Sequence, residues 1–198
     1  MIKYVSYAIT FAEVPNEVSL TIQLSNCPFH CDGCHSPELR EDTGEDLEEE
    51  LPLLLEQYAD RITCVCFMGD GPKGQYWQLR KIAELAHDKG LKTAQYSGCK
   101  DWDEYDESIR WFGDKYLDFD EYINGTECST EISEFLQWIG DTDFSNRYDY
   151  VKIGDYRKEL GGLNSPTTNQ KMYRLNKKTE EYEDITSMFW NKKNSAIE

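Results

Sequence analysis

Positive charge is scarce in this sequence, and several other features are missing altogether. Lysine and arginine total 21 against 38 aspartates and glutamates, which gives a formal net charge of −17. Because phosphate backbones are bound mainly by Lys and Arg, this balance disfavours nucleic acid as a partner. No apolar run approaches the length of a membrane span, and the opening residues MIKYVSYAITF lack a basic flank followed by an apolar stretch. We therefore expect no membrane partner and a cytoplasmic location.

Length and composition indicate a globular protein. The 198 residues are enough for one domain with a sizeable core, and a hydrophobic content of 39% suits such a domain. A stable disulfide framework is not expected, because cytosolic thiols are kept reduced. Seven cysteines is also an odd number, which a fully paired framework cannot use.

Hydrophobic patterning predicts an α/β fold. Alternation over 5–11 and 18–24 indicates two strands joined by a turn around Pro15-Asn16. Apolar runs and amphipathic periodicity predict further elements, in chain order a helix over 47–58, a strand at 62–68, a helix around 79–86, a strand at 91–98, a helix around 132–139 and a strand at 148–154. Strands that alternate with helices indicate a parallel sheet with crossover helices.

One main domain is expected over residues 1–175. The region at about 99–130 fits the strand–helix alternation worst, and we expect it to be an insertion. Beyond it, KMYRL and EEYEDI, joined by NKKT, predict a terminal hairpin. Residues 176–198 would therefore supply the last hairpin strand and a loose tail.

The segment NCPFHCDGCHS, residues 26–36, concentrates the sequence's soft metal ligands in one loop. Cys27, Cys31 and Cys34 form C-x3-C-x2-C directly after a predicted strand, where ligands gather in parallel α/β sheets. A disulfide, a structural zinc site and an iron–sulfur cluster are the three interpretations. Zinc needs a fourth ligand, such as His30 or His35, and no second C-x2-C knuckle is present. Thiolates suit a [4Fe–4S] cluster, in which three protein ligands leave one iron open, so the residue types fit a cluster.

C-x3-C-x2-C on one loop resembles the motif of the radical S-adenosylmethionine superfamily. The resemblance implies a partial (β/α) barrel with a [4Fe–4S] cluster on Cys27, Cys31 and Cys34. It also implies S-adenosylmethionine bound at the open iron, where one electron from the reduced cluster cleaves the sulfonium bond and releases a 5′-deoxyadenosyl radical.

The same resemblance implies which residues contact the S-adenosylmethionine. Gly69-Asp70-Gly71-Pro72 stands where the superfamily carries a Gly-Gly-Glu-Pro-like stretch, with the acidic residue displaced. Gly69 and Asp70, together with Gly33 and His35 beside the third cysteine, would bind the cofactor mainly through their backbone. Cys64 and Cys66, in contrast, lie in a predicted buried strand, where free cysteine acts as a small hydrophobe.

Three further segments are similar to one family, the activating proteins of anaerobic ribonucleoside-triphosphate reductase. Gly33 precedes the third cysteine, which is typical of that family. The segment DYVKIGDY resembles its late strand, with Asp155 in place of the usual proline, and LNSPTTNQKMYRL resembles its S-x-N-Q-R region at Asn169-Gln170, with Lys171 for the arginine. The likeness covers residues 2–96 and 148–175.

The family resemblance implies a glycyl-radical activase. Its partners would be the reductase's large catalytic subunit, which receives the radical on one glycine, and a flavodoxin-like protein that reduces the cluster. Three alternatives stay open: an activase of another glycyl-radical enzyme, a radical enzyme acting on a small molecule, and a non-catalytic interaction module stabilised by zinc.

Overall fold

The computed structural model describes residues 1–73, 75–105 and 148–190. The predicted insertion lies outside the described residues from position 106 onward. The predicted helix around 132–139, Cys128 and residues 191–198 of the predicted tail lie outside them as well. Within the described parts, no helix has the length and apolar composition needed to cross a bilayer.

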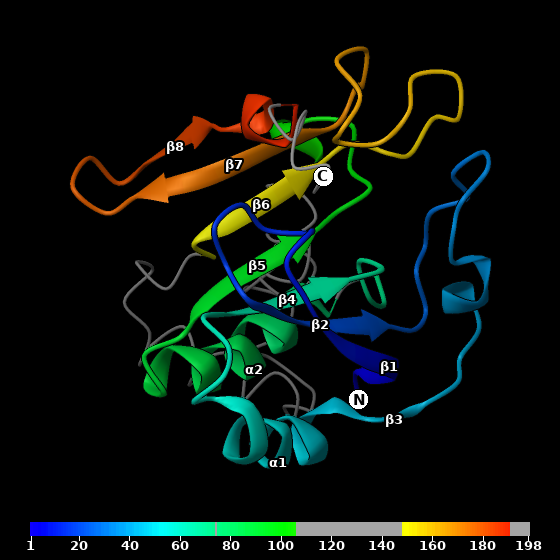
Figure 1. Ribbon diagram of the computed structural model, residues 1–198. Helices are drawn as coiled ribbons and strands as arrows, with labels where there is room; N and C mark the ends of the chain where they lie inside the picture. The colour runs from blue at the N-terminus through cyan, green and yellow to red at the C-terminus, as the bar shows by residue number, and fades with distance from the viewer. Residues whose placement is uncertain (74, 106–147, 191–198) are drawn as a thin grey trace, which may run out of the picture.

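A single eight-stranded sheet runs through the described fold, in the spatial order β3–β1–β2–β4–β5–β6–β7–β8 (Figure 1). The strands are β1 Lys3–Thr10, β2 Ser19–Leu24, β3 Glu45–Asp46, β4 Cys64–Met68, β5 Lys92–Tyr96, β6 Tyr150–Ile153, β7 Lys171–Asn176 and β8 Glu181–Asp184. The four central strands, β2, β4, β5 and β6, pair in parallel, whereas the pairs at both edges are antiparallel. The fold is therefore mixed α/β, and its assignment as a partial barrel stays a prediction.

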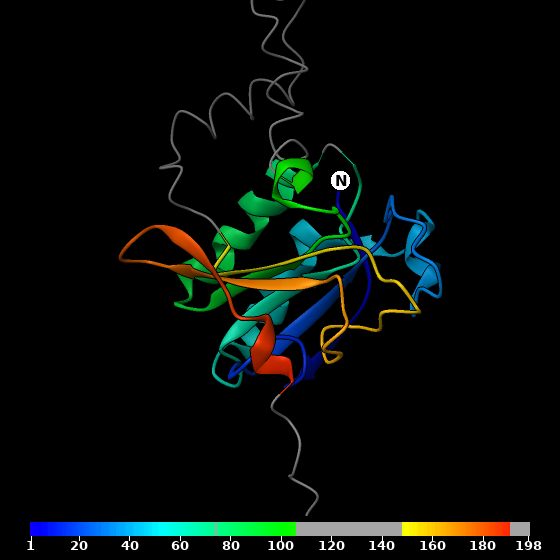
Figure 2. The ribbon, with the colours of Figure 1, turned by 90° about the horizontal axis from the view of Figure 1, so that it is seen from above.

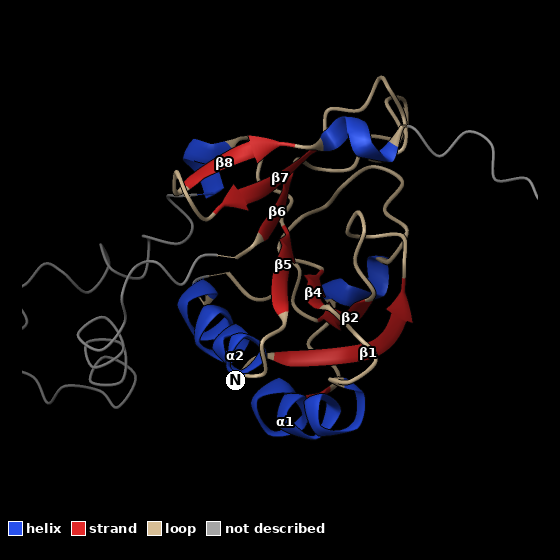
Figure 3. Cartoon of the chain, turned by 60° about the vertical axis from the view of Figure 1, so that its left-hand side comes forward, coloured by secondary structure: helices blue, strands red, loops and turns tan. Residues whose placement is uncertain are grey.

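Two α-helices cross between parallel strands. Helix α1 (Leu47–Tyr58) precedes β4, and α2 (Tyr76–Asp88) joins β4 to β5. Asp46 caps α1 by accepting a hydrogen bond from the backbone N–H of Glu48, and three glutamates in the first turn suit the positive end of the helix dipole. Both helices lie on the same face of the sheet (Figure 3).

Hydrophobic side chains cover both faces of the sheet. On the helix side, the buried stripe of α1 packs with Ile22 of β2 and Phe67 of β4. On the other side, Cys64 and Cys66 are buried with Met172 of β7 and Phe189, which belongs to the 3-10 helix η2 (Thr186–Phe189). Figure 2 shows the α-helices and η2 on opposite sides of the sheet.

The predicted hairpins are confirmed. Strands β1 and β2 are antiparallel, and Asn16 in the turn between them takes the left-handed conformation, with φ of 64°. Strands β7 and β8 form the second hairpin, and β8 is the edge of the same sheet. The two-residue strand β3 and the short 3-10 helix η1 (Pro37–Arg40) were not predicted, because neither is long enough to show a hydrophobic period.

Candidate metal and cofactor site

The loops that follow the four parallel strands meet at one edge of the sheet. In Figure 1 the arrowheads of these strands point toward the side where the blue segment after β2 lies. The loops begin after Leu24, Met68, Tyr96 and Ile153, respectively. Since carboxyl ends of parallel strands are where α/β sheets bind ligands, this edge is the candidate site.

Backbone and arginine contacts hold the cysteine loop in place. The N–H of Cys27 donates to the carbonyl of Leu39 at 2.9 Å, which closes the loop against η1. From the end of η1, the Arg40 guanidinium donates to the carbonyls of Phe29 (3.1 Å) and Cys31 (3.4 Å). The loop is therefore braced from within, although most of its residues lie outside helices and strands.

Cys27, Cys31 and Cys34 are half-buried free thiols. Burial raises the pKa of Cys27 to about 11, and negative charge on Asp70, Cys31 and Cys34 adds to the shift. The structure therefore brings the three predicted ligands close enough to interact electrostatically. Within the described residues, no three His, Cys, Asp or Glu side chains converge as the ligands of a single metal ion would.

The glycine-rich turn after β4 stands beside the cysteines. Gly69, Asp70 and Gly71 all have positive φ, at 92°, 64° and 75°, and the N–H of Gly71 donates to the carbonyl of Gly69 at 2.8 Å. A Cβ at Gly69 would come within 2.6 Å of the carbonyl oxygen of Leu24, so only glycine lets this turn approach the end of β2. The side chain of Asp70 is 3% exposed.

Lys152, on β6, is a site residue that the sequence analysis missed. Its side chain is buried, and its ammonium donates to the carbonyls of Ser97 and Gly154, at the ends of β5 and β6. Burial lowers its pKa to about 8, while the negative charges of Cys31 and Asp70 oppose that shift. A lysine within the apolar run YVKIG was the only available signal.

The loop after β6 packs against the far end of the cysteine loop. The rings of His35 and Tyr156 lie 4.7 Å apart, and the Lys158 side chain lies against Gly33, 3.3 Å from where a Cβ would stand. Both His35 and Gly33 are exposed at this contact. The predicted cofactor residues on the third cysteine's flanks therefore meet a second segment of the chain.

Asn169 and Gln170 fix the loop after β6 from the other side. The Asn169 side-chain amide donates to the carbonyl and the carboxylate of Asp155, both at 3.0 Å, and that of Gln170 donates to the carbonyl of Gly154 at 3.3 Å. These two residues connect the candidate site to the start of β7.

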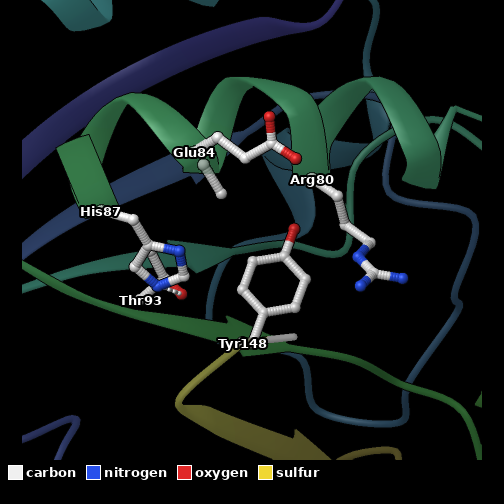
Figure 4. A pocket seen from close by; sticks show the side chains of 6 residues that line it. Arg80, Glu84, His87, Thr93 and Tyr148 are labelled. Carbon is white, nitrogen blue, oxygen red and sulfur yellow. Dashed lines mark hydrogen bonds between the residues drawn. The ribbon is translucent and has the colours of Figure 1, made fainter. Parts of the chain in front are cut away.

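A shallow hollow on α2 is a second place where polar side chains gather. Arg80, Glu84, His87, Thr93 and Tyr148 line it (Figure 4). His87 Nε2 lies 3.0 Å from Oδ2 of Asp149 and 3.1 Å from Oγ1 of Thr93. Because both contacts use the same ring nitrogen, this group lacks the relay of a catalytic triad, in which the acid and the nucleophile meet different nitrogens.

Comparison with protein-family models, curated proteins and solved structures gives no match for this chain.

Proposed function

We propose that this protein is a radical S-adenosylmethionine activase that generates a glycyl radical on anaerobic ribonucleoside-triphosphate reductase. On this proposal it works in the cytoplasm and holds a [4Fe–4S] cluster on Cys27, Cys31 and Cys34. A flavodoxin-like protein reduces the cluster, and the reductase's large catalytic subunit receives the radical. The support comes from the sequence resemblance and from the arrangement of this chain's residues at the candidate site.

One observation carries the proposal: the cysteine loop, the Gly69–Gly71 turn and Lys152 meet at the carboxyl edge of four parallel strands. These segments are far apart in the sequence, and no other described edge gathers three cysteines. A cluster loop and a cofactor-binding turn would have to be neighbours for the proposed chemistry, and the closeness of the cysteine loop to the Gly69–Gly71 turn supports the proposal.

The donor set suits an iron–sulfur cluster. Each thiolate of a three-cysteine cluster binds a different iron, so the sulfurs need to surround a group of atoms and not one point. The cysteines are half-buried, so the loop is partly accessible to solvent. The raised pKa of Cys27 means that a thiolate there needs nearby positive charge, which iron supplies.

The chain's own groups would bind and orient the cofactor. When bound, the cluster and S-adenosylmethionine supply one-electron cleavage of a carbon–sulfur bond. Gly69 and Gly33 have no side chains of their own, so on this proposal their backbone groups would contact the cofactor. The buried Asp70 carboxylate and Lys152 ammonium place one negative and one positive charge beside the cysteines, which suits an amino acid's ammonium and carboxylate groups.

Metal analysis after anaerobic purification tests the cluster. We expect about four iron and four sulfide per chain, with brown colour, and loss of both in Cys31→Ala. Cys66→Ala is the matched control, because Cys66 is buried on the far face of the sheet and its loss leaves the loop intact. One zinc per chain and no colour would instead support the zinc-stabilised interaction module.

Electron paramagnetic resonance tests the activity. The protein is mixed anaerobically with the candidate reductase subunit, S-adenosylmethionine and a reductant. A glycyl-radical doublet on the reductase subunit is the expected result. An intact, reducible cluster that cleaves S-adenosylmethionine without producing the doublet would exclude this reductase as the target and leave the other radical enzymes as candidates.

A further inference from the structure

Lys152 is a positive charge held inside a strongly acidic protein. The residue is 7% exposed, whereas the chain carries a formal net charge of −17. Lysine is rarely buried without a charged partner. In the part of the chain that the structure describes, the Lys152 ammonium forms no ion pair with a carboxylate and donates instead to the carbonyls of Ser97, at 3.3 Å, and Gly154. Its charge is therefore not cancelled by a directly bonded carboxylate.

The ammonium lies next to the backbone that supports the cysteine loop. Ser97, which accepts one of its hydrogen bonds, is followed in the chain by Gly98, and the ring of Phe29 packs on the backbone of Gly98. Phe29 is part of the cysteine loop and lies between Cys27 and Cys31. Two consecutive residues after β5 therefore connect the buried charge to the loop that carries the candidate metal ligands.

The side chain of Lys152 is positively charged at neutral pH. Burial lowers its pKa to about 8, and the negative charges of Cys31, Asp70, Asp155 and Cys27 act against that shift. Because the pKa stays above 7, most molecules carry the ammonium form. The same interactions place this charge within electrostatic reach of two of the three candidate ligands.

A buried charge affects how readily a nearby iron–sulfur cluster is reduced. The reduction potential of such a cluster depends on the net charge around it and on its exposure to water. One-electron reduction adds one unit of negative charge, which a neighbouring cation stabilises and a neighbouring anion destabilises. Water screens such effects at the surface, whereas inside a protein they are several times stronger.

We propose that Lys152 raises the reduction potential of the cluster held by Cys27, Cys31 and Cys34, so that the flavodoxin-like donor can pass one electron to it. This role rests on the proposed function, and it requires no contact between the ammonium and iron. Asp70, which is 3% exposed on the turn after β4, has the opposite effect. Two buried charges of opposite sign, supplied by different strand ends, then set the potential together.

A redox titration of the anaerobically reconstituted full chain, without S-adenosylmethionine, tests the role of Lys152. The reduced cluster is followed by electron paramagnetic resonance. At the potential that half-reduces the wild type, the ratio of reduced to oxidised cluster in Lys152→Met should fall about tenfold, which corresponds to about 59 mV for one electron. Lys152→Gln should behave in the same way, because its amide can still donate a hydrogen bond but carries no charge.

Lys158→Met is the matched control. Lys158 also lies against the cysteine loop, at Gly33, but it is exposed, so water screens its charge. Methionine keeps an unbranched side chain at that contact, and the potential should stay close to that of the wild type. Iron and sulfide contents equal to those of the wild type would establish that each variant has assembled its cluster.

Asp70→Asn separates charge from structural disturbance. It should make the cluster easier to reduce, and the double variant with Lys152→Met should return toward the wild-type potential, whereas a disturbed loop gives no reason for opposite signs. Unchanged potentials in both neutral Lys152 variants would overturn the proposal. So would a shift in Lys152→Met that is absent in Lys152→Gln, a shift of the same sign in Asp70→Asn, or loss of the cluster in both neutral variants.

The potentials and the activity can fail separately. Shifted potentials in a protein that produces no glycyl-radical doublet would overturn the proposed activity and leave the role of Lys152 standing. A doublet together with unchanged potentials would do the reverse. A wild type that binds no iron would overturn both.

Discussion

The ring of Phe29 lies directly on the backbone of Gly98. A Cβ at Gly98 would stand 2.5 Å from Cδ2 and 2.6 Å from Cγ of that ring. Phe29 belongs to the cysteine loop, between Cys27 and Cys31, and Gly98 follows β5. The contact therefore connects the candidate metal ligands to the end of a central strand. The aromatic ring occupies the space that a Cβ would need, so it depends on glycine at position 98.

Gly98→Ala should displace Phe29 and, with it, the cysteine loop. Overpacking of this kind costs about 1–3 kcal/mol, which urea unfolding can measure. Iron bound after anaerobic reconstitution should fall as well, because the loop cannot keep its arrangement around Phe29.

Gly162→Ala is the matched control for this substitution. The nearest atoms to its added Cβ would be 3.7 Å away, in ordinary contact, and Gly162 does not require positive φ. A smaller side chain at Phe29, as in Phe29→Leu, should recover part of the loss when combined with Gly98→Ala. Equal stabilities for Gly98→Ala and Gly162→Ala would contradict the role given to the ring contact.

The cysteine loop and the strands beside it can be recognised from patterns over neighbouring residues of the sequence. Alternation over 18–24 identifies the strand before Cys27, and the apolar run at 62–68 identifies the one before Gly69, because both patterns extend over neighbouring residues. Cysteine spacing is local too. The predicted ligands and the turn beside them could therefore be named without knowing how the strands are ordered.

Contacts that depend on the strand order could not be predicted in this way. In the sequence, Lys152 is one polar residue within a predicted strand. Its position beside Asp70 depends on the strand order, in which β6 lies next to β5 and β5 next to β4. The Phe29 contact with Gly98 has the same origin. Nothing in the local pattern distinguishes Gly98 from any other glycine that follows a strand.

Lys152→Met should destabilise the site without altering the sheet's hydrophobic packing. The substitution keeps the length of the side chain but removes the ammonium donor from the carbonyls of Ser97 and Gly154, of which Gly154 keeps the side-chain amide of Gln170. Unsatisfied buried groups cost about 1–3 kcal/mol, partly offset because a buried charge is also removed. Urea unfolding of the metal-free chain would measure the difference. Lys178→Met, in the exposed turn between β7 and β8, should change stability far less.

Asp149 should make the fold sensitive to acid. Its buried carboxylate accepts hydrogen bonds from the backbone N–H of Thr93 (2.9 Å) and from His87, and it pairs with Lys177 at 2.9 Å. Burial alone would raise its pKa, but these three partners outweigh it and hold the pKa at about 2, below the ordinary value of 3.8. A depressed pKa stabilises the fold above the unfolded-state value and loses that contribution as the pH falls toward 2.

To test this, the free energies of unfolding of the wild type and of Asp149→Asn are compared from neutral pH down to about pH 2. Near neutral pH the variant should be less stable by about 2 kcal/mol, and the gap should narrow between about pH 4 and pH 2. Asp60→Asn is the control, since Asp60 is an exposed residue after α1. A gap that stays constant with pH would show that lost packing, and not the carboxylate's charge, causes the difference.

Glu17 joins three strands at the edge opposite the cysteines. The carboxylate is 6% exposed and accepts hydrogen bonds from the hydroxyls of Thr63 (2.6 Å) and Tyr150 (2.8 Å) and from the ammonium of Lys92 (2.5 Å). Although burial opposes it, this set of donors lowers the pKa of Glu17. Because Thr63 precedes β4, Lys92 begins β5 and Tyr150 begins β6, one carboxylate aligns the amino ends of these strands.

Tyr150→Phe should therefore cost about 1.5–3 kcal/mol at neutral pH, the usual value of a hydrogen bond to a charged group. The loss should shrink as the pH falls through the depressed pKa of Glu17, since a protonated carboxyl group depends less on the donor. A double-mutant cycle with Glu17→Gln, measured by urea unfolding, isolates the interaction free energy between the two side chains. Tyr173→Phe, on β7 outside this cluster, is the control. If Tyr150→Phe and Glu17→Gln are simply additive, the hydroxyl and the carboxylate do not interact, and Glu17 does not help to align β6 through Tyr150.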